Sequence, residues 1–266
     1  MSLTDTVWTA GVNSSFEEPG NWSNGVPDAT KRIVLSDAPV DWPDAPAAPV
    51  TVGGLYAEEG CALVIMSWGD VTVVGPVVLG DPGGALCSIA VLDLTPQSTV
   101  EVNSGAYFSI SGARKLSGVN IDLRDAGQVE NVWTTGRVRL YGGWWYPGQI
   151  GDVGEPGSVE MYAGEIDNTW IIGDVDLWGG NFDGCEVIGT TRVHGPVRLL
   201  DLQNTLSLDS LELYATPDTV GDFGFGTLIP DVRLMRPEIV LPYCTFENAG
   251  MSVSRRPNVG APVVLR

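Results

Sequence analysis

The chain has 266 residues, with 33 acidic and 14 basic side chains and a formal net charge of −19. This charge disfavours nucleic acid and anionic membrane as partners, because a protein that binds phosphate groups needs a basic surface. A hydrophobic content of 44% excludes a fully disordered chain, and 34 glycines with 18 prolines are too many turn-forming residues for a helical bundle.

Residues 1–50 are rich in Trp, Pro and Asp and differ from the rest of the chain. They predict an N-terminal cap, because the exposed end of a stack of strands must be covered. The first residues have neither the basic region nor the apolar region of a signal peptide. We therefore expect a protein that is made in a cytoplasm and is not secreted by a signal peptide.

A short repeat runs through the middle of the chain. Its four clearest copies are Gly136-Arg-Val-Arg-Leu-Tyr-Gly-Gly-Trp144, Gly157-Ser-Val-Glu-Met-Tyr-Ala-Gly-Glu165, Gly173-Asp-Val-Asp-Leu-Trp-Gly-Gly-Asn181 and Gly195-Pro-Val-Arg-Leu-Leu200. Weaker copies precede them at Val100–Val102 and Ile121–Leu123. Each copy alternates apolar and polar residues before a turn, and this period of two indicates a half-buried strand.

Short strands that recur at this spacing, joined only by turns, favour a solenoid with one coil per repeat. The sequence therefore predicts an all-β protein whose body, residues 51–214, is a parallel β-helix. Leucine-rich repeats are a weaker interpretation, because their Asn or Cys position is missing and the spacing varies. A β-sandwich remains the main alternative fold.

The alternation also predicts which side chains face the core. We expect the following to point inward: Val138, Leu140, Val159, Met161, Val175, Leu177, Val197 and Leu199. We expect an outward column made of Glu101, Asp122, Arg139, Glu160, Asp176 and Arg198. In such a column Arg139 lies beside Glu160, and Asp176 lies beside Arg198, as pairs of opposite charge.

Residues 215–266 differ again. Six prolines interrupt them, which leaves only short extended pieces: Pro217, Pro230, Pro237, Pro242, Pro257 and Pro262. Proline does not fit inner strands, so this segment predicts an irregular, Pro-rich C-terminal cap or an attachment arm.

The stretch from Trp8 to Phe16, the motif Gly20-Asn-Trp-Ser-Asn-Gly-Val-Pro27 and the strand Ile33–Leu35 carry a resemblance. They resemble the opening segment of β-helix proteins of bacteria and bacteriophages, which include autotransporter-like passengers and virion spike or decoration proteins. The resemblance implies a β-helix. Because no secretion signal is seen, it favours a virion protein that is assembled in the host cytoplasm over a surface adhesin.

Few residues point to chemistry. His194 is the only histidine; it precedes Gly195-Pro196 and is expected in a turn, and no Gly-x-Ser-x-Gly motif accompanies it. Cys61, Cys87, Cys185 and Cys244 lack metal-ligand spacing and are expected to be buried thiols. No phosphate-binding or dinucleotide-binding motif occurs. We expect no cofactor and no metal.

Carboxylates could still serve a polysaccharide lyase or a glycosidase, because such enzymes use pairs of acids. Two groups lie close together in the sequence: Asp174, Asp176 and Asp183, and Glu160, Glu165 and Asp167. The residues around Asp174 and Asp176 alternate as in a strand, which departs from a calcium loop. Catalysis is therefore the less favoured interpretation.

Aromatic residues are the most distinctive surface feature. Tyr141, Tyr162 and Trp178 occupy the same repeat position and are expected to form one outward strip, and Trp144, Trp145 and Tyr146 add aromatic surface at the next turn. Such a cluster is typical of an interface, although stacking within the chain is an alternative role. We expect a structural virion protein, such as a capsid decoration protein, head spike or tail accessory, that binds other virion proteins, forms oligomers and has no catalytic activity. The alternative is a glycan-binding or glycan-cleaving surface protein.

Overall fold

The computed structural model describes residues 2–36, 43–44, 46–57, 71–80, 87–90, 93–94, 98–109, 115–200, 207–220, 231–236, 239 and 252–255. Within these ranges the chain is all-β, and its one helical element is the 3-10 turn η1 (Pro19–Asn21). The named strands pair in parallel, which confirms the predicted fold class of a parallel β-helix. No helix in the described part of the chain could cross a membrane.

Contacts divide the chain into two compact units, Met1–Gly136 and Arg137–Arg266. The first sheet of unit 1 contains, in order, β1 (Thr4–Val7), β2 (Lys31–Leu35), β4 (Gly54–Ala57), β6 (Val77–Leu79), β9 (Thr99–Val102) and β12 (Asn120–Leu123). A second sheet contains β7 (Cys87–Ala90), β10 (Ala106–Ser109) and β13 (Gln128–Glu130). On the remaining side, β3 (Val50–Val52), β5 (Val71–Val73) and β8 (Asp93–Leu94) pair with one another, and β11 (Lys115–Leu116) pairs with β14 (Val132–Thr134).

Unit 2 coils through three faces. The ladder face comprises β15 (Arg137–Leu140), β18 (Gly157–Met161), the second halves of β20 (Thr169–Leu177), β22 (Glu186–Val193) and β24 (Ser207–Leu213), then β26 (Asp231–Leu234) and β27 (Ser252–Arg255). The second face comprises β16 (Trp144–Trp145), β19 (Glu165–Asp167), β21 (Gly180–Asp183), β23 (Val197–Leu200) and β25 (Thr219–Val220). The third face comprises β17 (Gly148–Ile150) and the first halves of β20, β22 and β24.

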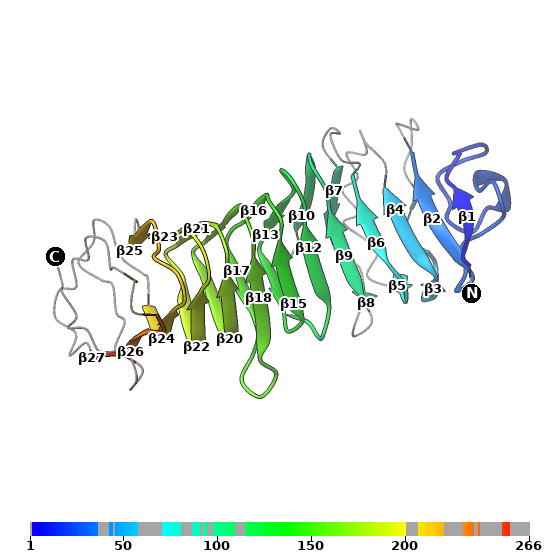
Figure 1. Cartoon of the computed structure of the whole chain (residues 1–266). Helices are drawn as coiled ribbons and strands as arrows, with labels where there is room; N and C mark the ends of the chain where they lie inside the picture. Colours follow the sequence, from blue (N-terminus) through cyan, green and yellow to red (C-terminus); the bar gives the residue numbers. More distant parts are fainter. Residues whose placement is uncertain are drawn as a thin grey trace. The chain divides into compact units, whose positions relative to one another are not determined.

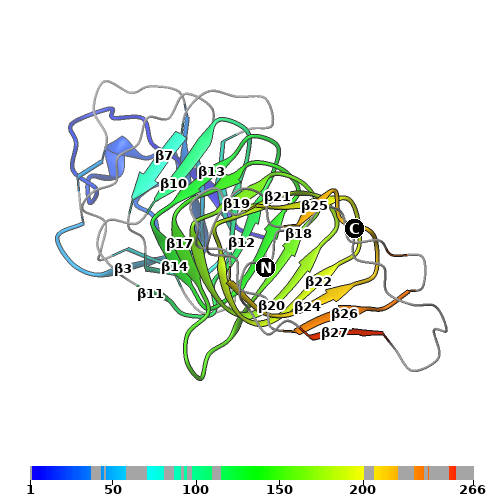
Figure 2. The ribbon, with the colours of Figure 1, turned by 90° about the vertical axis from the view of Figure 1, so that its left-hand side faces the viewer.

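The strands of unit 2 stack side by side in Figure 1, and Figure 2 separates the faces: β17 lies on one side of the coil, β21 on another, and β22 and β24 on the remaining side. The core lies between the faces. All eight residues predicted to point inward, from Val138 to Leu199, are at most 1% exposed. Alternation therefore predicts the buried side of these strands correctly.

The predicted outward column is right for three members in unit 2 and wrong for the fourth. Arg139 pairs in register with Glu160, and Glu160 pairs with Asp176. The next residue is Arg192, not Arg198, because Asp176 pairs with Arg192 on β22. Arg198 lies on the second face, where it pairs with Asn181.

The misplaced repeat has a physical cause. The copy that follows Gly173 begins at Gly189, not at Gly195, and its inward position holds Thr191, which is wholly buried. A polar residue at a core position conceals the alternation. Gly173 and Gly189 mark the true repeat, because their φ angles of 144° and 149° belong to the region that favours glycine. A Cβ on Gly189 would lie 2.3 Å from the Gly173 carbonyl oxygen.

One further expectation differs in detail from the structure. In unit 1, Glu101 and Asp122 pair in register as predicted, but Asp122 is only 4% exposed and is not a solvated outward charge. Strands of the sheets occur in all three predicted segments: β1 and β2 lie within residues 1–50, and β26 within residues 215–266 pairs with β24. The Pro-rich C-terminal segment thus contains strands of the ladder face, although most of it lies outside the described residues.

Thr191 offers a test of this arrangement. Its buried hydroxyl has no hydrogen-bond partner among the described residues, so it loses hydration without compensation. Thr191→Val should raise the free energy of unfolding by about 1 kcal/mol, as measured by urea denaturation.

Thr134 is the matched control, because it is also wholly buried but donates from Oγ1 to the Val119 carbonyl oxygen at 2.5 Å. Thr134→Val should lower the free energy of unfolding by about 1–2 kcal/mol. Equal destabilisation by both substitutions would contradict the assignment of Thr191 to an unsatisfied core position.

Candidate functional site

Five aromatic rings form a continuous stack along the ladder face of unit 2. In order they are Tyr141, Tyr162, Trp178, His194 and Tyr214, with successive ring centroids 5.1, 4.8, 4.7 and 5.0 Å apart. Successive ring planes differ by only 1° to 18°. This spacing equals the distance between parallel strands, so the coil itself sets the separation of the rings. We call this set the aromatic ladder.

The backbone fixes the position of each ring. Every ladder residue follows the last residue of its strand. In the four ladder residues after Tyr141, the N–H donates to the carbonyl oxygen that ends the preceding strand of the ladder face. Trp178 donates to Met161 at 2.8 Å, and Tyr214 donates to Val193 at 2.8 Å. The rings therefore occupy equivalent places on successive coils, which explains why they stack with nearly parallel planes.

The sequence prediction identified only three members of the ladder. Tyr141, Tyr162 and Trp178 are brought together as expected and are 40%, 40% and 37% exposed. His194 and Tyr214 were missed because the repeat was aligned at Gly195. Tyr214 could have been identified as the residue after the apolar-polar-apolar triplet Leu211–Leu213. His194 follows Thr191–Val193, in which the polar Thr191 breaks this pattern.

The aromatic residues at the turn after Tyr141 are Trp144, Trp145 and Tyr146, and they differ in exposure. Trp144 is 46% exposed and stacks on Tyr146, with centroids 6.3 Å apart, but it lies on the second face and not on the ladder face. Trp145 is wholly buried, so its predicted contribution to a surface is wrong. Successive residues of a strand point to opposite sides, and exposure of Trp144 therefore requires burial of Trp145.

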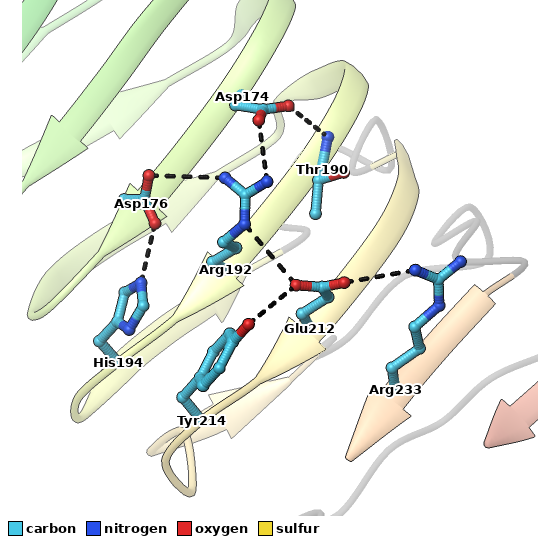
Figure 3. A network of polar contacts seen from close by, with 8 residues as sticks. All are labelled: Asp174, Asp176, Thr190, Arg192, His194, Glu212, Tyr214 and Arg233. Carbon is cyan, nitrogen blue, oxygen red and sulfur yellow. Dashed lines mark hydrogen bonds and ion pairs between the residues drawn. The ribbon is translucent and has the colours of Figure 1, made fainter. Parts of the chain in front are cut away.

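A network of charges runs beside the aromatic ladder (Figure 3). Arg192 lies at its centre, with its guanidinium nitrogens 2.9 Å from Asp174, 3.6 Å from Asp176 and 3.6 Å from Glu212. Arg233 extends the network to the next strand, 3.3 Å from Glu212. Arg192 on β22 thus lies between two carboxylates of the preceding strand, β20, and one carboxylate of the following strand, β24.

The ladder and the network share residues. Nε2 of His194 donates to Oδ1 of Asp176 at 2.8 Å, and the Tyr214 hydroxyl donates to Glu212 at 3.2 Å. His194 also stacks between Trp178 and Tyr214, so both faces of its ring are covered. It lies just beyond β22, in the turn position predicted from the sequence.

The ionisation of this surface follows from the same contacts. Partial burial opposes ionisation of Asp174, but hydrogen bonds from Arg192 and Thr190 outweigh it and lower the pKa of that carboxyl. The hydrogen bond to Asp174 raises the pKa of Arg192. Asp174 and Arg192 are therefore both charged near neutral pH and form an ion pair.

The structure separates the acids that were considered for catalysis. Asp174 and Asp176 lie on the ladder face, whereas Asp183 lies on the second face. There Asp183 pairs in register with Asp167. Burial, and then the charges of Asp183 and Glu165, raise the pKa of Asp167 to about 6.

Other expectations about chemistry fall partly outside the described residues. Cys185 is wholly buried, as expected of a structural thiol, and burial raises its pKa. Cys61 and Cys244 lie outside the described residues, and only the backbone of Cys87 is described. Among the residues that the structure places, no three His, Cys, Asp or Glu side chains form a group that could hold a metal ion.

Comparison with protein-family models, with curated proteins and with solved structures finds no match to this chain.

The charge network predicts unequal effects for two arginines. Arg192→Ala should lower the free energy of unfolding by about 1–2 kcal/mol, because three carboxylates lose their shared cation and then repel one another. Arg198→Ala, an exposed arginine on the second face, should change it by less than about 0.5 kcal/mol. Equal losses in urea denaturation would contradict the register that places Arg192 in the column.

The raised pKa of Asp167 predicts that the free energy of unfolding depends on pH. Its pKa is raised to about 6 in the folded chain. The protonated carboxyl of Asp167 therefore contributes fully to the free energy of unfolding below the pKa of an unfolded carboxyl, and this contribution is lost as the pH rises through 6. Asp167→Asn should be more stable than the native chain at pH 7. The difference should be only about 1 kcal/mol, because water still reaches part of the native carboxyl, and it should vanish near pH 4.

Asp174→Asn is the control with the opposite sign. The pKa of Asp174 is lowered on folding, so its contribution is present at pH 7 and is lost as the pH falls through the folded value. This variant should be less stable than the native chain at pH 7 and should approach it in acid. Parallel pH profiles for the two variants would contradict the assignment.

Proposed function

We propose that this chain is a structural protein that works by binding, and that it is a subunit of a bacteriophage virion, such as a capsid decoration protein, head spike or tail accessory. Its partners are then other virion proteins, the major capsid or tail protein among them, and further copies of itself. The resemblance of the opening segment around Asn21-Trp22 supports the virion setting. The acidic composition argues against nucleic acid and membrane as direct partners.

The observation that carries this proposal is the distribution of exposed apolar side chains. Of the nine large hydrophobic residues exposed in the described part of the chain, seven belong to unit 2: Tyr141, Trp144, Val153, Tyr162, Trp170, Trp178 and Ile188. Three of them are members of the aromatic ladder. Clustered exposed aromatic residues on a rigid support are typical of protein interfaces, because they bury area with little loss of side-chain freedom.

The polar groups of the ladder face suit binding better than turnover. His194 donates to Asp176 and is covered by rings on both sides, so neither its ring face nor that nitrogen is open to a substrate. Asp174 and Asp176 are paired with Arg192. A general acid or base must instead reach the reacting group with a suitable pKa.

The alternative, a glycan-binding surface, is favoured by a different residue. Stacked ladder rings cover one another's faces, whereas a sugar needs an open face. Trp170 on the third face is 41% exposed, stacks on no other ring among the described residues, and lies in register between Gln149 and Glu186. For glycan cleavage, which needs a pair of carboxylates, Asp167 and Asp183 lie in register on the second face, but Asp183 is only 4% exposed.

The double substitution Tyr162→Ser and Trp178→Ser should leave a folded chain, as judged by circular dichroism, that no longer co-sediments with the particle. Trp170→Ala is the matched control, because it removes an exposed aromatic ring from the third face. Mass spectrometry of purified phage particles from the source strain should detect the chain at a fixed ratio to the capsid protein. Absence from particles would overturn the virion proposal, and loss of polysaccharide binding only in Trp170→Ala would establish the glycan alternative.

A further inference from the structure

Among the described residues, the first strand of unit 1 pairs with another strand along one edge only, and just beyond its end the isolated antiparallel bridge between Trp8 and Trp22 joins the other edge. The paired edge of β1 faces β2, where Thr4 and Trp8 donate their N–H groups to Thr30 and Val34 at 3.1 and 3.0 Å. Alternate residues of a strand turn their N–H and C=O groups to opposite edges. The backbone groups of Asp5 and Val7 therefore face the free edge, which is the kind of surface that accepts a foreign strand.

Two consecutive residues occupy this edge. The Val7 N–H donates to Oγ of Ser23 at 2.9 Å, and the N–H of Ser23 donates to the Val7 carbonyl oxygen at 3.0 Å. The side-chain amide of Asn24 donates to the Asp5 carbonyl oxygen at 2.7 Å. Three of the four edge groups on Asp5 and Val7 are thus satisfied, two of them by side chains rather than by a strand. We call Ser23 and Asn24 the edge clamp.

A buried anchor holds the edge clamp in place. Asn21, which is fully buried, accepts hydrogen bonds at Oδ1 from the N–H groups of Val12 and Asn13, at 2.8 and 3.1 Å. Trp22 packs edge-on against Trp8 and Phe16, with ring centroids 4.8 and 5.3 Å away. Ser23 and Asn24 follow directly in the sequence. In the motif Asn-Trp-Ser-Asn, the first two residues therefore form the buried anchor and the last two form the edge clamp.

The edge clamp closes the free edge without creating a new one. Within Ser23–Gly25 the backbone forms no strand. The clamp uses the Ser23 hydroxyl and the Asn24 amide, with the Ser23 N–H as its one backbone donor, where an added strand would use only its backbone. Thr6 contributes one further bond, from its Oγ1 to the Gly25 carbonyl oxygen at 2.8 Å. Without the clamp, the edge would offer the unpaired groups of Asp5 and Val7 to any strand with a free edge of its own.

We infer that Ser23 and Asn24 act as a block to strand addition, which keeps β1 from pairing with β1 of a second copy of this chain. The second copy is the relevant partner because the same edge on two molecules is self-complementary about a two-fold axis, as an antiparallel pair. This role goes beyond the proposed binding function and does not depend on it. Association of the native chain is thereby directed away from the β1 edge.

The test is the double substitution Ser23→Ala and Asn24→Ala. It should remain folded by circular dichroism and should form dimers, with a molar mass about twice that of the native chain in light scattering at high concentration. Ser14→Ala with Ser15→Ala is the matched control, because both hydroxyls lie in the same segment and, among the described residues, bond to Asp44 and Glu17 and not to β1. This control should have the molar mass of the native chain.

Adding Val7→Pro to the double variant should abolish dimer formation, because proline removes the edge N–H while the bonds to β2 come from neighbouring residues. A folded double variant that keeps the native molar mass would overturn the inference, as would a dimer that persists with Val7→Pro. If the double variant does not fold, hydrogen exchange of backbone amides in the single variant Ser23→Ala is the test. The Val7 amide should lose its protection from exchange while the Thr6 amide keeps it. Unchanged protection of the Val7 amide would overturn the inference.

Discussion

The parallel hydrogen-bonded register between successive coils is the constraint on which the rest of unit 2 depends. On the ladder face, Val159 pairs with Val175, Val175 with Thr191 and Thr191 with Leu211, so one column of inward residues continues through four strands. Side chains one residue away form the outward column, and those one residue beyond the strand form the aromatic ladder. Because strands lie about 4.8 Å apart, each column is a row of like positions at a distance that suits ring stacking and ion pairs.

This constraint explains why the surface of unit 2 is preorganised. The rings stack with their faces covered, and Arg192 joins two carboxylates of β20 to one carboxylate of β24. Each side chain is held by a neighbour on the next coil, so a partner that meets this face has little side-chain freedom to remove. The same preorganisation leaves His194 committed to Asp176 and to two rings, which suits a fixed recognition surface rather than proton transfer.

The sequence predicts the fold class and the buried side of the strands because both follow from a strict period of two. It predicts three of the five ladder rings for the same reason. It misplaces the rung after Trp178 because Thr191 occupies a core position, while Val197 and Leu199 on the second face imitate the pattern. Identifying Gly189 as the start of that rung required its left-handed φ angle and its close approach to Gly173. The burial of Trp145 could have been predicted from alternation with Trp144, whereas the pairing of Asp167 with Asp183 depends on how the second face turns.

The most direct test of the account is a measurement of the register itself by disulfide trapping. In the double variant Asp176→Cys and Arg192→Cys, the two positions are register partners on adjacent strands, at a Cα separation of about 4.8 Å that permits a disulfide. Under mild oxidation, peptide mapping by mass spectrometry should find a bridge that joins positions 176 and 192. The matched variant Asp176→Cys and Arg198→Cys should form none, because position 198 lies on the second face. A bridge between positions 176 and 198, with none between 176 and 192, would contradict the register and every column derived from it.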